Sequence, residues 1–510
     1  MSNLTPTSNS PPVPSTATAP EDRVPLLQKF AYSLGACHDV WGHWLYPNLV
    51  NTVFIIYLGV SPVLVGLAGM LIRFFDAISD PIFGRLSDNT RTRFGRRRPF
   101  ILVGGILAGL GMPMLFFVGK GWSDHNYFWF MIVSSAVFIP VMSSFNMAYQ
   151  SLGAEMTPDY NERTNLYSFR FAFQKIPEFM IYGAPWFTTL VVWVGVTHSN
   201  LFERIASLLT TRSAWHSAAT DQQPNVVIGA QVCFGVLGLI MVATAVLSFV
   251  LLRERYYDKV VERNQAKISV KEALVETFKC RPFRLLLLMV ISFAAGQSMV
   301  GGLAYYTTIY HVCAGDLARG NGWWSIMGVT NSVMAVAGLY LCGAISKKVG
   351  KRHTIVGALF FSVVMYAATW WLFNPNLPWL TPIVWGLVGG AGASGIWMLF
   401  SSMQADVMDF DELATGKRRE GAFGACSSWL IKGGLALGTG GTNMLLPLTG
   451  FDARLGGTQS EHTVTMIRLL LMVVPVVGLL LAIAFIARYP LTHDKMIEIR
   501  GQLEKRRGKV

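Results

Sequence analysis

Two aspartates, Asp76 and Asp80, lie four residues apart within an apolar stretch that runs from Gly59 to Gly84. At this spacing both carboxylates share one face of a helix and point the same way at membrane depth. One such charge at the centre of a membrane helix costs about 2.5–3.5 kcal/mol on insertion scales, and two like charges also repel each other. We therefore predict that the pair faces a water-filled cavity and binds a coupling cation, either a proton or a metal ion such as Na⁺. The simpler alternative is that one acid is neutralised by a neighbouring arginine such as Arg73.

The first apolar segment, predicted as a helix over residues 31–57, combines polar and aromatic residues of the kind that bind sugars. A sugar presents hydroxyl groups for hydrogen bonds and a weakly apolar ring face that stacks on aromatic side chains. The candidate residues are His38, Asp39, Trp41, His43, Trp44, Tyr46, Asn48 and Asn51. Asp39 could accept two hydroxyl hydrogens at once. The two histidines could instead be packing residues with satisfied hydrogen bonds.

Two further predicted helices, over residues 126–153 and 166–196, carry polar side chains. The first offers neutral oxygens and amides that suit an Na⁺ shell or sugar hydroxyls, namely Ser143, Ser144, Asn146, Tyr149 and Gln150. The second places Arg170, Gln174 and Glu178 at intervals of four residues, which makes one polar stripe. Lys175 lies beside this stripe, and we expect its partner to be a carboxylate of the first or second helix.

The last part of the chain adds one buried cation and a group of acids. Lys432 lies inside the predicted helix 421–447, and we expect it to pair with Asp76 and Asp80 across a central cavity. An incoming cation would then compete with its ammonium group. The predicted helix 378–405 is followed by Asp406, Asp409, Asp411 and Glu412, which we interpret as a cytoplasmic gate facing basic loops.

The composition places these residues in a membrane protein. Of the 510 residues, 52% are hydrophobic and only 14% are charged, whereas soluble domains carry about 25% charged residues. The apolar residues form continuous blocks of about twenty or more, long enough to span a bilayer as helices, rather than the alternating pattern of strands. We predict an all-α polytopic membrane protein with twelve transmembrane helices, those named above together with 62–87, 99–119, 226–252, 285–313, 321–345, 353–373 and 463–487.

The net charge of +13 is distributed as expected for a membrane protein rather than for a nucleic-acid-binding protein. Lysine and arginine gather in loops on one side, within residues 91–98, 253–284, 347–352, 417–419 and 505–509. This positive-inside pattern predicts a multi-pass protein of the cell membrane, in bacteria the inner membrane, with both termini cytoplasmic and lipids as neighbours. The six cysteines lack zinc-site spacing, and no nucleophile or nucleotide-binding motif is present. We therefore expect neither an enzyme nor a resident cofactor.

The chain divides into two parts that repeat one pattern. We predict a disordered tail (1–24), a six-helix bundle (25–252), a cytoplasmic linker (253–284), a second six-helix bundle (285–489) and a basic tail (490–510). A glycine followed by a tight basic loop occurs after the second helix, over 84–98, and again after the eighth, over 343–352. Parallel six-helix repeats are the build of the major facilitator fold, with the substrate bound between them. Ordinary positive-inside loops are the alternative explanation. The external loop 197–225, amphipathic around 201–209, is expected to cap the outer face.

One motif resembles a known family. Residues 73–84, RFFDAISDPIFG, followed by TRTRFGRRRP over 90–99, are similar to the glycoside–pentoside–hexuronide:cation symporters, the major facilitator family that includes melibiose permease. The stretches 159–163, 405–410 and 432–434 agree with this family, and the resemblance extends from about residue 25 to 490.

The resemblance implies that Asp76 and Asp80 bind the coupling ion, Na⁺ or H⁺, with Ser79 and Ser143 as further oxygen ligands. It also implies that Arg170, Trp397, Ser428 and Lys432 line the sugar or cation region. With the residues discussed above, the predicted substrate site consists of His38, Asp39, Trp41, Asn146, Tyr149, Arg170, Trp397, Ser428 and Lys432.

The chain also departs from melibiose permease, which has a sugar-binding Asp where Asn146 stands and an Asn where Ser79 stands. Asp39 matches another sugar-binding Asp only if one residue is skipped. The galactoside preference of that permease therefore does not transfer.

These observations predict a monomeric secondary active transporter that couples a sugar or glycoside to Na⁺ or H⁺ by alternating access. We expect Gly84, Asp88 and Arg96 to form a conformational latch, with Asp406 and Asp409 on the opposite half. Two alternatives stay open: a lysolipid or lipid carrier of the same fold, and a sugar sensor that does not transport.

Overall fold

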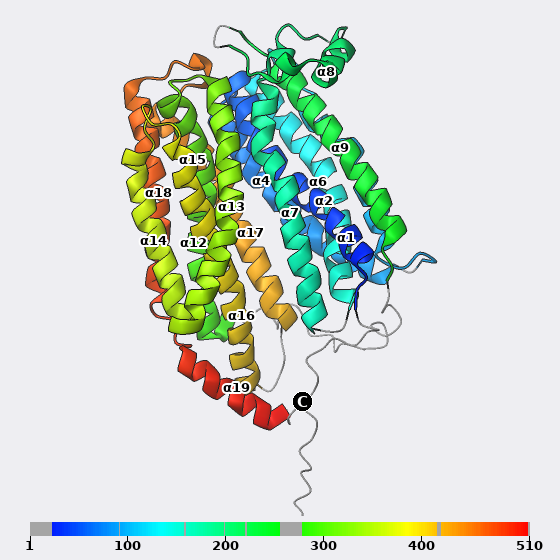
Figure 1. The fold of residues 1–510 in the computed structure, drawn as a ribbon, viewed down its shortest axis with the longest axis vertical. Coiled ribbons are helices and arrows are strands. Elements are labelled where there is room, and N and C mark those ends of the chain that lie inside the picture. Colours follow the sequence, from blue (N-terminus) through cyan, green and yellow to red (C-terminus); the bar gives the residue numbers. More distant parts are fainter. Residues whose placement is uncertain are drawn as a thin grey trace, which may run out of the picture.

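The computed structural model describes residues 23–507 apart from residues 91, 158–159, 198, 220–221, 255–277 and 416–419. Within these residues the chain is almost entirely helical, and its long helices run side by side (Figure 1). Residues 1–22 of the predicted tail 1–24 and most of the predicted linker 253–284 lie outside the described residues.

The helices of the N-terminal part form a first group. It begins with a helical run interrupted by two π-helical stretches: α1 (Leu26–Leu34), α2 (Ala36–Val40), η1 (Trp41–Leu45), α3 (Tyr46–Val50) and η2 (Asn51–Tyr57). It continues with α4 (Pro62–Asn89), α5 (Arg98–Gly111), η3 (Met112–Phe116), α6 (Asp124–Glu155), α7 (Tyr160–Thr188) and α9 (Val226–Leu251). Between α7 and α9 lie η4 (Val191–Trp193), the surface helix α8 (Leu201–Thr210) and η5 (Arg212–Trp215).

The second group contains the helices of the C-terminal part. These are α12 (Arg281–Thr307) with η6 (Thr308–Val312), α13 (Leu317–Val349), α14 (Lys351–Leu372), α15 (Leu380–Trp385) with η7 (Gly386–Gly392) and α16 (Ala393–Thr415), α17 (Glu420–Leu445) with η8 (Leu446–Thr449), η9 (Ala453–Leu455), α18 (Glu461–Ile486) and α19 (His493–Arg507). Helix α8 lies at one end of the molecule and α19 at the other (Figure 1).

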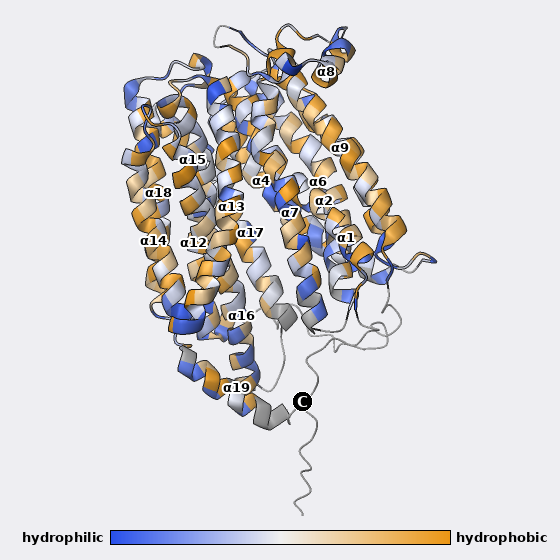
Figure 2. Cartoon of the chain, viewed as in Figure 1, coloured by the Kyte–Doolittle hydropathy of each residue, from blue (hydrophilic) through white to orange (hydrophobic). Residues whose placement is uncertain are grey.

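Nine helical segments of the described residues are long and apolar enough to cross a membrane. Figure 2 shows hydrophobic residues along the length of helices such as α9 and α14, and hydrophilic residues in the connecting loops. Three further runs, 26–57, 160–188 and 420–445, occupy positions predicted for helices 1, 5 and 11. These three carry many of the polar residues singled out from the sequence.

Two segments differ from the sequence prediction. Helix α7 ends at Thr188 rather than at 196, because residues 190 and 194 instead form isolated bridges with Ser217 and Pro224. The tail after residue 490 was expected to be a plain basic segment, but it contains α19. This helix buries Met496, Ile499 and Leu503, an apolar stripe at helical spacing hidden among basic residues.

The two groups meet along α4 and α17 and along α7 and α13. The backbones of α4 and α17 approach closely, since a Cβ added to Gly66 would lie 2.7 Å from the carbonyl oxygen of Gly440. Among the described residues, five hydrogen-bonded pairs join the groups toward the α8 end: Thr52–Tyr305, Asn48–Trp324, Pro185–Asn321, Tyr182–Ser325 and Asn51–Asn443. The Tyr305 hydroxyl donates to Asn321 Oδ1 at 2.8 Å and accepts from Thr52 at 2.5 Å.

Replacing Tyr305 with phenylalanine should loosen this end of the bundle, because both hydrogen bonds of its hydroxyl are lost. A buried group left unsatisfied costs about 1–3 kcal/mol. Hydrogen–deuterium exchange should become faster around Thr52 and Asn321 and stay unchanged in α14 and α18. The matched control is Tyr306→Phe, since the buried Tyr306 hydroxyl has no hydrogen-bond partner in the described part of the structure. Equal exchange in the two variants would contradict this role of Tyr305.

Away from α8, each group carries ion pairs at a matching place. Arg96 and Arg97, in the loop after α4, lie 2.5 and 3.1 Å from Glu155 Oε1 at the end of α6. Lys351, at the start of α14, lies 2.6 Å from Asp406 Oδ2 on α16. The basic residue follows the second helix of its group in both cases, and the acid lies on the fourth. The repeat seen in the sequence therefore extends to these contacts.

The predicted gate residues are divided between these two places. Arg96 pairs within the first group and Asp406 within the second. Gly84 lies on α4, and Asp409 is half-buried on α16. The side chain of Asp88 lies outside the described part of the structure. A latch between the two halves through Asp88 stays a prediction.

Candidate functional site

Asp76 and Asp80 project from α4 toward Lys432 of α17. The Lys432 ammonium lies 3.2 Å from Asp76 Oδ2 and also contacts Asp80 Oδ2. Asp76 is 4% exposed, whereas the side chains of Asp80 and Lys432 are 13% and 24% exposed to solvent. The pairing predicted from the sequence is thus confirmed, and it crosses the boundary between the two groups of helices. Two carboxylates share one ammonium group, and Asp80 Oδ1 has no hydrogen-bond partner among the described residues.

His43 and Arg73 extend this cluster toward the first helical run. His43 Nε2 lies 3.8 Å from Asp76 Oδ1. Arg73 donates to the backbone oxygen of His43 at 3.1 Å and lies over the ring of Trp44, 5.1 Å from its centroid. The described ion pairs join neither acid to Arg73, so Lys432 is the direct partner of both. The sequence marked His43 as polar but did not link it to Asp76, because that contact depends on how the first run packs against α4.

Ser79 and Ser143 connect α4 to α6 next to the acids. Their hydroxyl groups are 2.6 Å apart, and Ser79 Oγ also donates to the backbone oxygen of Asp76 at 3.3 Å. Both residues are buried. Among the described residues, no cluster of three or more His, Cys, Asp or Glu is arranged as a metal site. A bound Na⁺ would therefore need hydroxyl or backbone oxygens in addition to the two carboxylates.

Three residues predicted to contact substrate, Asp39, Tyr149 and Arg170, form a separate polar network inside the first group. Arg170 is ion-paired with Asp39, and its Nε donates to the Tyr149 hydroxyl at 3.0 Å. Tyr149 in turn donates to the backbone oxygen of Tyr32 at 2.8 Å. Asn146 is also buried in this group, where its Oδ1 accepts from Gln150. The network joins α1, α2, α6 and α7, so its polar groups already have partners within the protein.

His38 and Trp41 are buried against neighbouring helices and do not line the cavity between the two groups, so their contact with substrate stays a prediction. His38 is fully buried and stacks on Phe145, with their ring centroids 4.0 Å apart. The indole of Trp41 is buried and donates to the backbone oxygen of Pro177 at 2.8 Å. Both side chains therefore attach the first helical run to neighbouring helices.

A cavity of about 640 Å³ lies between the two groups of helices. Its wall includes Trp44, Asn48, Asn51, Arg73, Gln174, Lys175, Glu178, Tyr182, Gln297, Tyr305, Trp324, Trp385, Trp397, Thr442 and Asn443. Of the predicted substrate residues, Trp397 lies on this wall, whereas Asp39, Asn146, Tyr149 and Arg170 do not. Ser428 is exposed elsewhere on α17. Aromatic rings, amides and charged groups surround a space of the size that small-molecule sites have.

Glu178 is the acidic residue among those that line the cavity. It is also the partner of Lys175, so the partner that we expected for Lys175 was wrong. Lys175 Nζ lies 2.7 Å from Glu178 Oε2 on the same helix, at i,i+3 spacing. We expected a carboxylate of the first or second helix instead. Residues three apart are neighbours on one face of a helix, so Glu178 reaches Lys175 within α7 and no carboxylate from another helix is needed.

Long membrane-spanning helices in two groups around a central cavity define a transporter of the major facilitator type. Residues 44–493 match the family described as MFS/sugar transport protein. The chain therefore belongs to this family.

The relatives and the solved structures agree with this class. The chain is 26% identical to an uncharacterized symporter of Synechocystis sp., over 95% of this chain and 98% of the relative. It is 24% identical to the isoprimeverose transporter of Lactiplantibacillus pentosus, over 92% and 89% of the two chains. A crystal structure of a D-xylose–proton symporter shares the fold with a TM-score of 0.59 and 14% identity, covering 91% of this chain and 98% of that chain. The protein is thus a membrane transporter of the sugar-transporter type and not an enzyme.

Proposed function

We propose that the protein is a symporter in which Na⁺ or H⁺, bound at Asp76 and Asp80, drives transport of a sugar or glycoside through the central cavity. The observation that supports this most is the Lys432 ammonium, which bridges both acids across the boundary between the two halves. Lys432 is ion-paired with both acids, whereas the Arg73 guanidinium donates to the His43 backbone, so the three directly paired groups keep one negative charge for a coupling ion to balance. An ion that binds Asp76 and Asp80 weakens their ion pairs with Lys432. Because these ion pairs join the two halves, ion binding and the relative position of the halves are linked.

The proposed transport cycle uses the two groups of helices as rigid halves, residues 25–252 and 285–489, joined by the linker 253–284. The hydrogen bonds at the α8 end hold one side of the cavity closed and must break when that side opens. We place α8 outside the cell and both termini in the cytoplasm, since the basic loops are at the opposite end. The tails 1–24 and 490–510 then lie on the cytoplasmic side of a monomer in the cell membrane.

The driving force is sufficient for this task. A membrane potential of about 100 mV contributes roughly 2.3 kcal/mol for each charge moved inward. Because each tenfold ratio requires about 1.4 kcal/mol, one cation sustains accumulation of a neutral sugar by about forty-fold. No second energy source is needed.

The direct test is whether the coupling ion changes sugar affinity in the purified protein. Probe sugars are D-xylose, isoprimeverose and methyl β-D-glucoside, the first two taken from the names of the symporter and the relative described above. Calorimetric titrations with and without Na⁺, at pH 5.5 and 8, should show at least one probe binding about tenfold more tightly in one ionic condition, because coupling is reciprocal. Binding of every probe with the same affinity in all four conditions would contradict ion coupling.

A further inference from the structure

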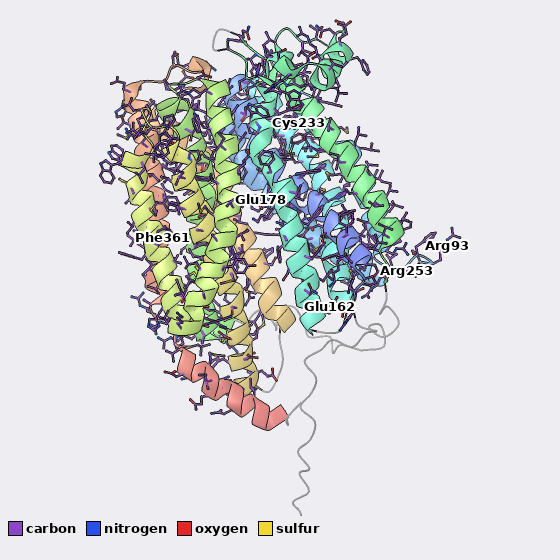
Figure 3. All side chains as sticks on the ribbon, viewed as in Figure 1. Arg93, Glu162, Glu178, Cys233, Arg253 and Phe361 are labelled. Carbon is purple, nitrogen blue, oxygen red and sulfur yellow. The ribbon has the colours of Figure 1, made fainter. Side chains whose placement is uncertain are left out.

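The cavity wall carries a charged pair that ion coupling leaves without a role. Lys175 and Glu178 lie on one face of α7, and their side chains retain 35% and 19% of their exposure. Glu178 lies about midway along the bundle, between α7 and α13 (Figure 3). Charged residues at membrane depth are costly and usually face a water-filled cavity with a functional role. The hydrogen bond from Trp41 to the Pro177 backbone fixes this part of α7 against the first helical run.

Other groups on the same wall also offer acceptors. The side-chain oxygens Gln174 Oε1 and Asn443 Oδ1 are buried and have no hydrogen-bond partner in the described part of the structure. Asn443 is only 5% exposed, and its Nδ2 donates to Asn51 Oδ1 at 3.0 Å, so the free side of its amide is the oxygen. Unsatisfied buried acceptors cost free energy, and hydroxyl donors from a ligand would supply the missing bonds. The wall is therefore suited to a ligand rich in hydroxyl groups.

We propose that Glu178 is the carboxylate that binds the hydroxyl groups of the transported sugar, with Lys175 holding its side chain in place. This assignment rests on the proposed function and replaces Asp39, whose carboxylate is occupied by Arg170 away from the cavity. A carboxylate accepts two hydroxyl hydrogens at once. Lys175 neutralises it and donates to a further sugar oxygen. The aromatic rings of the wall, Trp397 among them, provide a surface for the sugar ring.

The position of Glu178 also bears on selectivity. A sugar with its own carboxylate would bring a second negative charge beside Glu178, which is unfavourable in a partly desolvated cavity. A neutral sugar avoids this repulsion. Glu178 belongs to the first group of helices and Asn443 to the second, so a ligand that contacts both residues connects the halves. Glu178 therefore shifts the preference of the site toward neutral glycosides, against the attraction that Lys175 and Arg73 on the same wall exert on an acidic sugar.

The experiment measures binding of the probe sugars to the full-length protein in nanodiscs. In Glu178→Gln, the affinity for the best-bound probe should fall about 10–100-fold, the range expected when a hydrogen bond to a charged group is lost. The affinity for methyl β-D-glucuronide relative to methyl β-D-glucoside should rise in this variant, because Lys175 and Arg73 on the wall are then no longer opposed by the Glu178 carboxylate. Glu203→Gln makes the same chemical change on the exposed surface of α8 and should leave affinity unchanged.

A charge exchange separates a binding role from a structural one. Lys175→Glu combined with Glu178→Lys keeps the ion pair on α7 but moves the carboxylate by nearly one helical turn. A structural pair would tolerate this exchange, whereas a sugar-binding carboxylate would not, so affinity should fall as it does in Glu178→Gln. Monodeoxy analogues of the best-bound sugar provide the third comparison. One of them should lose affinity for the wild type but not for Glu178→Gln.

The outcomes separate this inference from the proposed function. If the wild type binds a probe in an ion-dependent manner and Glu178→Gln binds it within twofold of the wild type, the role of Glu178 is refuted and the symport proposal stands. If the wild type binds no probe in any ionic condition, the proposed sugar function fails and the role of Glu178 fails with it.

Discussion

Replacing Asp80 with asparagine should abolish ion-driven sugar accumulation in proteoliposomes, while exchange of labelled for unlabelled sugar continues. The variant keeps the size and shape of the side chain but removes one of the two negative charges that Lys432 bridges. With Asp76 alone, the ammonium of Lys432 balances the remaining carboxylate, and no charge is left for a coupling ion. Accumulation should therefore fall from as much as about forty-fold at 100 mV to equality of the two sides.

Exchange is the readout that separates lost coupling from lost folding, because it requires an intact cavity but no net ion movement. The control variant is Asp452→Asn, which changes an exposed aspartate in the loop before η9 and should transport like the wild type. Undiminished accumulation by Asp80→Asn under an imposed ion gradient would contradict the role assigned to this residue.

Replacing Lys432 with alanine should destabilise the protein and make its stability strongly dependent on cations. Removing one partner of a fully buried ion pair costs about 3–5 kcal/mol. The loss should be smaller here, about 1–3 kcal/mol, because the Lys432 side chain keeps 24% of its exposure. The two carboxylates then repel each other, so added Na⁺ or low pH should raise the thermal midpoint more than in the wild type.

A second variant tests the explanation of this effect. Asp80→Asn combined with Lys432→Gln removes one charge of each sign and should recover most of the stability lost in Lys432→Ala. Lys347→Ala removes an exposed lysine near the end of α13 and serves as the control. A thermal midpoint of Lys432→Ala equal to that of the wild type, with the same response to Na⁺ and pH, would show that Lys432 does not balance the acids.

The sequence predicted the helices and the ion pair across the halves for a clear physical reason. Charged side chains within predicted membrane spans are costly to leave unpaired, so Lys432 and the two aspartates were expected to meet, although the same reasoning gave Lys175 the wrong partner. The positions of most helices followed from the length of the apolar blocks. Helix α19 escaped prediction because its short apolar stripe lies within a strongly basic segment.

The substrate region was harder to predict because it depends on which way each helix faces. Asp39 and Glu178 are both acids on polar membrane helices, and the sequence ranked Asp39 higher. Only the packing of the helices shows that the Asp39 carboxylate is ion-paired with Arg170 and that Glu178 lies on the cavity wall. His43 likewise reaches Asp76 through a contact between two helices that no spacing along the chain indicates.

Ion-coupled sugar transport is measured by following sugar uptake and ion flux together in proteoliposomes that contain the wild-type protein. Each probe sugar is supplied under an inward Na⁺ gradient, an inward proton gradient, or neither. We expect that one of the two gradients drives accumulation, that sugar entry carries the same ion inward, and that an ionophore collapsing that gradient stops both. Sugar entry that only equilibrates, at one rate under all three conditions and without ion flux, would contradict ion-coupled transport.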